Sequence, residues 1–203
     1  PMIISTGMAT VDEIGEAVDT ARSAGCHDLV LLKCTSSYPA SPSQSNLRTI
    51  VDLRDRFGVQ SGLSDHTLGT AAPVASVAMG ATVIEKHFTL SRADGGPDAA
   101  FSLEPSEFAQ LVIDTKTAWQ ALGGVMYGPT DAEKRSLQFR RSIYLVRDIR
   151  AGEKLSKDHI RTIRPGLGLA PKYIDAIIGK RVRRDLKRGT PVTADLIEEW
   201  NDS

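Results

Sequence analysis

The sequence predicts an α/β protein, in which half of a TIM (β/α)8 barrel is followed by a small, mostly β domain. Strand and helix patterns alternate four times over residues 1–123, which is typical of parallel strands with helices outside them. A complete barrel takes about 250 residues and eight strands, so four strands make half of one. An open doubly wound sheet is the structural alternative, although no GxGxxG motif follows the first strand.

The elements of the barrel half follow from apolar runs and from helix start and stop signals. A strand is predicted at residues 2–4, and Thr10 with Glu13 forms a capping-box pattern that begins a helix over residues 11–24. The same signals predict strands at 29–32, 59–63 and 82–84, helices at 46–57, 70–79 and 105–122, and loops at 34–45, 64–69 and 91–102.

The remainder of the chain differs in texture. Residues 124–140 are polar and predict a linker arm, and residues 141–203 predict a second domain with β segments at 142–146, 161–163 and 181–183. The phrases DIRAGE at 148–153 and DLKRGT at 185–190 are each followed by a short acid-bearing helix start. This similarity indicates an internal pseudo-symmetry.

Charge and cysteine content exclude some functions. The 25 Lys and Arg residues balance the 25 Asp and Glu residues, so no excess positive charge favours nucleic acid or an anionic membrane. The two cysteines, Cys26 and Cys34, are too few for a disulfide framework, which favours a reducing cytoplasm. No apolar run is long enough for a transmembrane helix. Because Pro1 leads directly into an apolar run, we expect the chain to be a cut piece.

Polar side chains follow every predicted strand, where the working residues of parallel barrels lie. They are expected to converge on one rim, and they are Ser5 and Thr6, then Lys33, Cys34, Thr35, Ser36 and Tyr38, then Ser64, Asp65 and His66, and finally Glu85, Lys86 and His87.

His66 and His87 end neighbouring strands, where two neutral imidazoles could share one divalent metal and leave positions open for substrate. Each could instead be a hydrogen-bonded histidine of the barrel. Glu85 shares a strand face with His87 and could orient a sugar hydroxyl or move a proton, or it could pair with a lysine. Ser5, Ser64 and Thr6 are small hydroxyl residues at strand–helix junctions, a setting that favours phosphate binding. Each of them could instead be a helix cap.

Other residues have plainer interpretations. Asp98 lies in a turn that could hydrogen-bond a sugar or be ordinary surface, and Arg164 precedes a rigid Pro-Gly turn that could simply be solvated. Cys34 is expected to pack rather than to act as a nucleophile. His27 and His159 lie in loop contexts and are not expected to bind metal.

Several phrases resemble the sialic acid synthase family, in order and over nearly the whole chain. They are ISTGMA at 4–9, CTSSYP at 34–39, GLSDHTLG at 62–69, IEKHFTL at 84–90, GPD at 96–98 and RPG at 164–166. Residues 141–200 resemble that family's antifreeze-like SAF domain, a β-clip fold. Three segments are most similar to the pseudaminic acid synthase branch, at 94–105, 118–129 and 138–146.

The resemblance implies a carbon–carbon bond-forming transferase. A divalent metal, Mn²⁺ or Mg²⁺, would be held by His66 and His87 and would polarise the aldehyde of an open-chain amino sugar, 2,4-diacetamido-2,4,6-trideoxy-L-altrose. C3 of phosphoenolpyruvate would attack that aldehyde, water would add at C2, and phosphate would leave to give pseudaminate. Glu85 joins the two histidines as an implied catalytic residue.

The resemblance also implies binding roles. Ser5, Ser36 and Ser64 would contact phosphoenolpyruvate. Tyr38, Asp98 and Glu85 would hold the sugar or assist proton movement. Arg164 would reach across a homodimer, in which the SAF domain caps the partner's barrel, to hold the sugar's acyl group.

Two departures from the family and three rival functions stay open. Ser36 stands where many members carry Asn, and the family's N-terminal half barrel with its phosphoenolpyruvate-binding lysines is absent, so we expect a fragment of impaired activity. The rivals are an N-acetylneuraminate or legionaminate synthase, an inactive fragment acting as a binding module, and an aldolase that forms a Schiff base at Lys33 or Lys86.

Overall fold

A four-stranded parallel sheet forms the centre of the first of two units. The computed structural model describes residues 1–200, and the chain divides between Val125 and Met126. The strands are ordered β1-β2-β3-β4, with bounds β1 Met2–Ser5, β2 Leu29–Cys34, β3 Gln60–Asp65 and β4 Val83–Lys86. The helices between and after them are α1 Val11–Ser23, α2 Thr49–Phe57, α3 Ala71–Ala78 and α4 Pro105–Leu122. The predicted half of a parallel barrel is confirmed.

Local sequence explains where the helices begin. The capping box of α1 is present, since Glu13 N donates to Thr10 Oγ1 at 3.3 Å and Thr10 N donates to Glu13 Oε2 at 2.6 Å. Helix α4 begins at Pro105, where the missing N–H of proline costs nothing. Helix α2 begins at Thr49 instead of Asn46, because Asn46 has a φ of 44°, which is left-handed rather than helical.

All four strands are longer than predicted at their carboxyl ends, and β1 ends at Ser5. Strand β2 continues to Cys34, β3 to Asp65 and β4 to Lys86, so Ser64, which was expected in a loop, is a strand residue. The predicted loop at 91–102 contains two 3₁₀ turns, η2 Arg92–Asp94 and η3 Ala99–Phe101.

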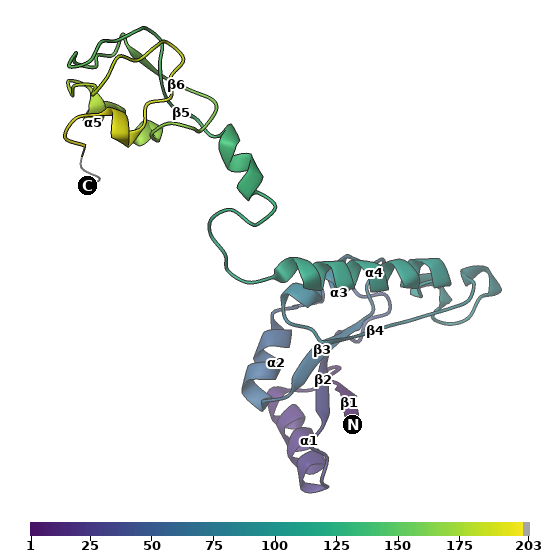
Figure 1. Ribbon diagram of the computed structural model, residues 1–203. Helices are drawn as coiled ribbons and strands as arrows, with labels where there is room; N and C mark the ends of the chain where they lie inside the picture. The colour runs from purple at the N-terminus through teal and green to yellow at the C-terminus, as the bar shows by residue number, and fades with distance from the viewer. Residues whose placement is uncertain (201–203) are drawn as a thin grey trace. The chain divides into compact units, whose positions relative to one another are not determined.

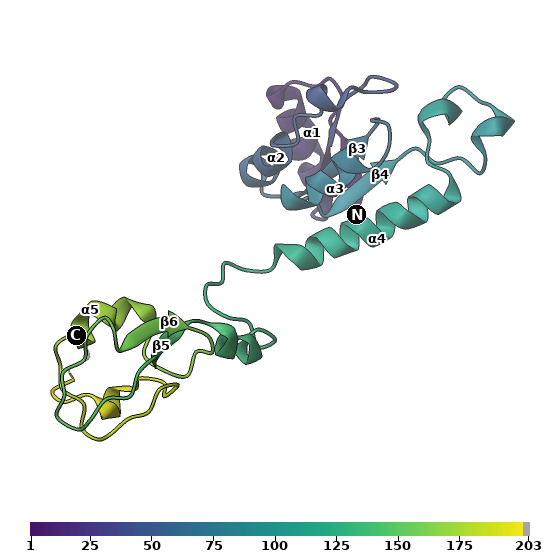
Figure 2. The same cartoon turned by 90° about the horizontal axis from the view of Figure 1, so that it is seen from above.

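The sheet has one covered face and one open face. Helices α1, α2 and α3 lie along one side of the strands (Figure 1 and Figure 2). The core on that side consists of Val18, Ala21, Leu29, Leu31 and Leu53. Side chains alternate between faces along a strand, so Ile3, next to the core-packed Ile4, faces the other way and is 54% exposed. The open face corresponds to the interior of a closed barrel.

The strand register decides which side chains share the open face. Leu31 packs in the helix-side core, so Leu32 and Cys34 point to the open face. Cys34 is opposite Ser64, and Ser64 is opposite Glu85. Ser64 and Glu85 therefore belong to the open face, whereas Asp65 and Lys86 point towards the helices.

The second unit is built on a short antiparallel pair, β5 Ser142–Leu145 with β6 Ile160–Ile163, and on one short helix, α5 Ile174–Ile177. Its core is a single cluster that consists of Ile143, Leu145, Ile149, Leu155, Ile160, Ile177, Val182, Leu186, Val192, Leu196 and Ile197. Part of the segment interpreted as a linker is ordered, because the 3₁₀ helix η4 Lys134–Phe139 lies within it and Gly166 N donates to Gln138 O at 2.8 Å.

The pseudo-symmetry predicted for the second unit is confirmed by reciprocal hydrogen bonds. Ile149 and Leu186 exchange backbone N–H···O bonds of 3.0 and 2.9 Å. Asp148 Oδ1 accepts from Arg188 N and Asp185 Oδ1 accepts from Ala151 N, both at 2.8 Å. Each aspartate thus holds the turn of the other DIRAGE-like phrase, and the two phrases form one motif used twice.

The strand predicted at 181–183 is wrong. Arg181 bridges to Lys154 and Val182 to Ile197 as isolated pairs, because consecutive residues face different partners and no ladder develops. Over residues 1–200, none of the helices has the length and apolar character that crossing a membrane requires.

Candidate functional site

Two histidines meet at the carboxyl ends of β3 and β4. His66 and His87 follow these neighbouring strands, and their ring centroids are 5.1 Å apart with planes at 75°. Tyr38 lies 4.3 Å from the His66 ring, and Phe101 lies 4.9 Å from the His87 ring. Tyr38 and Phe101 are themselves 5.9 Å apart, which closes a ring of four aromatic side chains.

His66 is held in one orientation by the backbone. Its Nδ1 lies 2.9 Å from Thr35 O, and its own carbonyl accepts from Ala40 N at 2.9 Å. A carbonyl oxygen only accepts hydrogen bonds, so Nδ1 carries the proton of the neutral ring and Nε2 keeps its lone pair. Only 6% of His66 is exposed. This backbone contact prepares Nε2 as a ligand atom.

His87 faces a carboxylate from the loop after β4. Its Nδ1 lies 3.7 Å from Asp98 Oδ2, and the two side chains are 29% and 51% exposed. This distance is longer than a hydrogen bond, so Asp98 lies beside the ring without fixing which of its nitrogens carries the proton. The structure therefore brings Asp98 into the histidine site.

Ser64 and Glu85 form the next layer on the open face. Ser64 Oγ donates to Glu85 Oε1 at 2.7 Å. Glu85 is exposed, Ser64 is 3% exposed, and the second carboxylate oxygen of Glu85 has no side-chain partner among the described residues. The alternative in which Glu85 pairs with a lysine is therefore wrong in this structure. Glu85 is available for substrate.

The hydroxyl residues expected near phosphate lie along the β1–β2 part of the same rim. Ser5 is exposed on β1 opposite Leu32, and Thr6 Oγ1 accepts from Cys34 N at 3.3 Å. Ser36 is exposed, and its Oγ lies 3.9 Å from Cys34 Sγ. Thr6 is committed to holding β2, which leaves Ser5 and Ser36 as the accessible hydroxyls.

Neither lysine proposed for a Schiff base faces the histidines. Lys86 Nζ is 2.5 Å from Asp65 Oδ2, and these side chains are 1% and 2% exposed on the helix side of the sheet. Lys33 is half-buried and donates to Thr35 Oγ1 at 2.9 Å and to Cys34 O. Burial lowers the pKa of Lys33. The geometry does not support the aldolase reading.

The remaining candidates lie elsewhere. His27 is exposed before β2, and His159 Nδ1 contacts Ser156 Oγ at 3.0 Å in the second unit. Cys34 is 5% exposed, as expected for packing. Arg164 is exposed in the second unit, next to Pro165, whose carbonyl accepts from Ser142 Oγ at 2.8 Å.

The histidine pair fits a divalent metal with open coordination positions. Across residues 1–200, no group of three or more His, Cys, Asp and Glu side chains is placed to hold a metal ion, so a closed structural site is not formed there. Two neighbouring imidazoles, of which His66 is orientated by its Nδ1 contact with Thr35 O, suit a catalytic metal that is completed by water and substrate.

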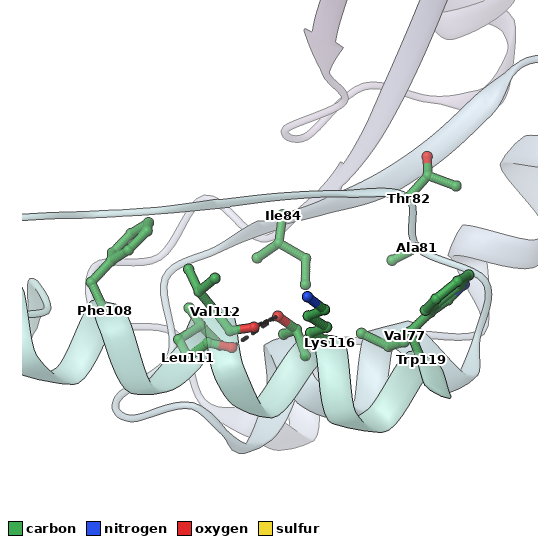
Figure 3. Close-up of a pocket in the computed structure, with 10 residues that line it drawn as sticks. Val77, Ala81, Thr82, Ile84, Phe108, Leu111, Val112, Lys116 and Trp119 are labelled. Carbon is green, nitrogen blue, oxygen red and sulfur yellow. Dashed lines mark hydrogen bonds between the residues drawn. The ribbon is translucent and has the colours of Figure 1, made fainter. Parts of the chain in front are cut away.

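A separate groove of about 530 Å³ lies on the other side of β4, between that strand and α4 (Figure 3). Ile84 lines it, whereas the adjacent Glu85 points to the open face. Its other walls are mainly apolar, with Phe108, Val112 and Trp119 from α4. Lys116 of α4 also lines the groove, but no histidine, cysteine or carboxylate is among its lining residues, and the groove continues the open edge of the sheet.

Sequence reasoning missed Phe101. This residue is 6% exposed and packs between His87 and Tyr38, although it lies in a loop after Asp98. The sequence offers one signal that could have identified Phe101. It is an aromatic residue in a Gly-rich loop shortly after the candidate residue Asp98, and a solvated loop seldom needs a buried aromatic side chain.

The chain resembles known families and proteins over nearly its whole length. The model of the NeuB family matches residues 1–127, and that of the SAF domain matches residues 140–198. The pseudaminic acid synthase of Helicobacter pylori is 40% identical over 200 residues, covering 98% of this chain and 58% of that protein. The N,N'-diacetyllegionaminic acid synthase of Legionella pneumophila is 43% identical over 204 residues, covering 98% of this chain and 57% of that protein.

A solved structure gives the same result. The spore coat polysaccharide biosynthesis protein SpsE of Bacillus subtilis matches with a TM-score of 0.59 and 32% identity, over 99% of this chain and 62% of that chain. The chain thus spans less than two thirds of the length of each of these three proteins.

Proposed function

This chain belongs to the NeuB family, and we propose that it supplies the metal- and sugar-binding half of a synthase that condenses phosphoenolpyruvate with an amino sugar. The observation that carries the proposal is the pair of imidazoles, 5.1 Å apart at the ends of two parallel strands, in a chain that resembles pseudaminic acid synthases at 40% identity.

The reaction joins C3 of phosphoenolpyruvate to the aldehyde carbon of the open-chain sugar. The aldehyde oxygen becomes an alkoxide and gains a proton. Water adds at C2 and gives up a proton, and the C2–O bond to phosphate breaks, so that phosphate leaves with the electron pair. One carbon–carbon bond and one carbon–oxygen bond form, and one carbon–oxygen bond breaks.

The residues of this chain have distinct tasks in that sequence. His66 and His87 would hold Mn²⁺ or Mg²⁺, and the cation would supply Lewis-acid polarisation of the aldehyde when bound. Glu85, fixed by Ser64 at 2.7 Å, moves a proton at the reacting end of the sugar. Asp98 and Tyr38 orient the sugar beside the histidines, and their placement in the same cluster supports this role.

Phosphoenolpyruvate is proposed to bind at the β1–β2 part of the rim. Ser5 and Ser36 offer accessible hydroxyl groups there, and Ser64 of the neighbouring β3 offers one that is bonded to Glu85. Among the described residues, no lysine or arginine of the first unit donates to these three hydroxyls. A triply charged substrate needs cationic partners, and the rest of a complete barrel would supply them. The phosphate-binding half of the reaction is therefore expected to depend on additional chain.

Charge distribution supports a role for the second unit as a cover over the site of a second copy. Residues 126–203 carry 17 Lys and Arg against 11 Asp and Glu, whereas residues 1–125 carry 8 against 14. The units are thus oppositely charged, and complementary charge favours their association. In that homodimer, Arg164 would hold the sugar's acyl group.

The test is phosphate release from phosphoenolpyruvate and Mn²⁺, with the chain alone and with a segment that completes the barrel. Three sugars are compared, namely 2,4-diacetamido-2,4,6-trideoxy-L-altrose, N-acetylmannosamine and the sugar precursor of N,N'-diacetyllegionaminic acid. We expect phosphate release with 2,4-diacetamido-2,4,6-trideoxy-L-altrose and with neither of the other two sugars, and we expect a chelator to abolish it. Release with the completed barrel that no chelator abolishes would contradict the proposal.

Legionaminate synthesis is the second candidate, because the Legionella pneumophila relative is 43% identical over nearly the same span. Both sugars carry two acylated amines, so the histidine site alone does not separate them. Preference for the legionaminic precursor in the same assay would select this branch, and preference for N-acetylmannosamine would select the sialic acid branch.

A further inference from the structure

A buried ion pair lies directly behind the histidine site. Lys86 Nζ is 2.5 Å from Asp65 Oδ2, with side chains 1% and 2% exposed. Strand register places Asp65 opposite Lys86 and Ser64 opposite Glu85. The two cross-strand pairs therefore lie back to back, one on the open face and one on the helix side of the sheet.

Each member of the buried pair is the chain neighbour of one histidine. Asp65 precedes His66 and Lys86 precedes His87. The buried pair therefore anchors the backbone one residue before each histidine.

The pair also clamps the far side of His66. Asp65 accepts from Thr67 N at 3.2 Å and from Thr67 Oγ1 at 3.0 Å, and Lys86 Nζ donates to Thr67 O. The residues on both sides of His66 are thus tied to the residue before His87. Two of the three donors of the Lys86 ammonium and both oxygens of the Asp65 carboxylate are used within this network.

Stability alone gives little reason for a buried ion pair here. Desolvation of two charges offsets most of their attraction, so an apolar pair of similar volume is often equally stable. A charged pair differs from an apolar pair because its hydrogen bonds are directional. These hydrogen bonds fix the ends of β3 and β4 at one separation.

We propose that Asp65 and Lys86 are positioning residues that set the separation and orientation of His66 and His87 for one divalent cation. This inference rests on the proposed function, because it requires that the histidines bind the cation. Neither residue touches the cation or the substrate. Their effect passes through the backbone of the two strand ends.

The test compares Mn²⁺ binding in the wild-type chain and in the double variant Asp65→Leu/Lys86→Met. Removing both charges leaves no uncompensated ion, so folding is expected to persist. Free Mn²⁺ is followed by electron paramagnetic resonance, and folding by circular dichroism and thermal unfolding. The expected result is a 10- to 100-fold weaker Kd for Mn²⁺, as is typical when groups behind metal ligands are lost.

The matched control is the exposed pair of α2, in which Arg56 Nη2 lies 2.9 Å from Asp52 Oδ1. Asp52→Asn/Arg56→Met removes an ion pair of the same unit far from the histidines in sequence, and it should leave Mn²⁺ affinity unchanged.

A long-range ¹H–¹⁵N spectrum of the histidines gives a second readout. His66 should be the Nδ1–H tautomer in wild type and a mixture in the double variant.

A folded double variant that binds Mn²⁺ as tightly as wild type would overturn the inference. If the double variant does not fold, Thr67→Val replaces it, since this change removes only the hydroxyl contact to Asp65. Thr67→Val should weaken Mn²⁺ binding several-fold, and unchanged affinity would overturn the inference as well. A wild-type chain that binds no Mn²⁺ would instead refute the metal role in the proposed function.

Discussion

Phe101 offers a sharp test of how the site is built. Its ring centroid lies 4.9 Å from that of His87 and 5.9 Å from that of Tyr38, and only 6% of the residue is exposed. Phe101→Ala removes this wall, whereas Phe101→Leu keeps most of its volume. The perturbation thus separates loss of packing from loss of an aromatic partner.

The magnitude follows from burial. Truncation of a buried Phe to Ala costs about 3–5 kcal/mol. Tyr38, on one side of Phe101, is 55% exposed, so water can fill part of the space, and we expect the low end, about 3 kcal/mol. Phe101→Leu keeps most of the apolar volume and should cost about 1.5 kcal/mol or less.

The assay is urea unfolding of the first unit together with Mn²⁺ titration. Phe57→Leu is the matched control, because Phe57 packs on the core of α1, α2 and β2, away from the rim. Phe101→Leu and Phe57→Leu should lower stability comparably, but only Phe101→Leu should weaken Mn²⁺ binding, because His87 loses its aromatic neighbour. Equal Mn²⁺ affinity in both variants would refute the role of Phe101 in orienting His87.

Three further predictions concern the fold. The guanidinium of Arg92 and the N–H of Glu104 lower the pKa of Glu107 from 4.5 to about 2, so the stabilisation by the Glu107 carboxylate is present above about pH 4.5 and is lost as pH falls towards 2. The Tm difference between wild type and Glu107→Gln should therefore vanish over that pH range. A Tm difference that stays constant with pH would contradict this prediction. Gly62→Ala places the new Cβ 2.1 Å from Val83 O and should lower the free energy of unfolding by about 3 kcal/mol or more. Gly15→Ala, whose Cβ would lie 3.8 Å from Phe57 Cε1 within α1, should raise it by about 0.5–1 kcal/mol in urea unfolding. Equal effects of the two substitutions would be inconsistent with the close approach of Gly62 to Val83. Ile160→Val and Ile197→Val occupy matching places in the repeated motif, at 1% and 0% exposure, so each should cost about 0.5–1.5 kcal/mol, and a large inequality in calorimetry would argue against the pseudo-symmetry.

Much of the fold could be predicted because its signals are local. Buried parallel strands are continuous apolar runs, as at Leu29–Leu32, and Thr10 with Glu13 specifies a helix start by a hydrogen bond between near neighbours. The ends of strands were less predictable. Ser64 and Glu85 are polar, and only their cross-strand hydrogen bond and the register show that they continue β3 and β4.

The parts that could not be predicted depend on distant contacts. The 3₁₀ helix at Lys134–Phe139 is polar in sequence, and a bond from Gly166 N to Gln138 O holds it to a turn far along the chain. The segment at 181–183 has strand-like residues, but its neighbours bridge to different segments. Phe101 belongs to the site because a loop folds back towards His87, which periodicity does not reveal.

The histidine site shows the same division. Strand order alone brings the ends of β3 and β4 together, so the proximity of His66 and His87 follows from a parallel sheet. The strand order does not reveal which nitrogen of His66 carries the proton. That position depends on the contact between His66 Nδ1 and Thr35 O, which lies just after the neighbouring strand β2. The partner of Lys86 could likewise be assigned only from the three-dimensional structure.

The central claim is that His66 and His87 hold one divalent cation, and Mn²⁺ binding by electron paramagnetic resonance tests it most directly. Wild type, His66→Ala and His87→Ala are compared with the controls His27→Ala and His159→Ala, which alter histidines outside the site. We predict one Mn²⁺ per chain in wild type and in both controls, and its loss in His66→Ala and in His87→Ala. Binding that survives both site substitutions, or that is absent in wild type, would contradict the account.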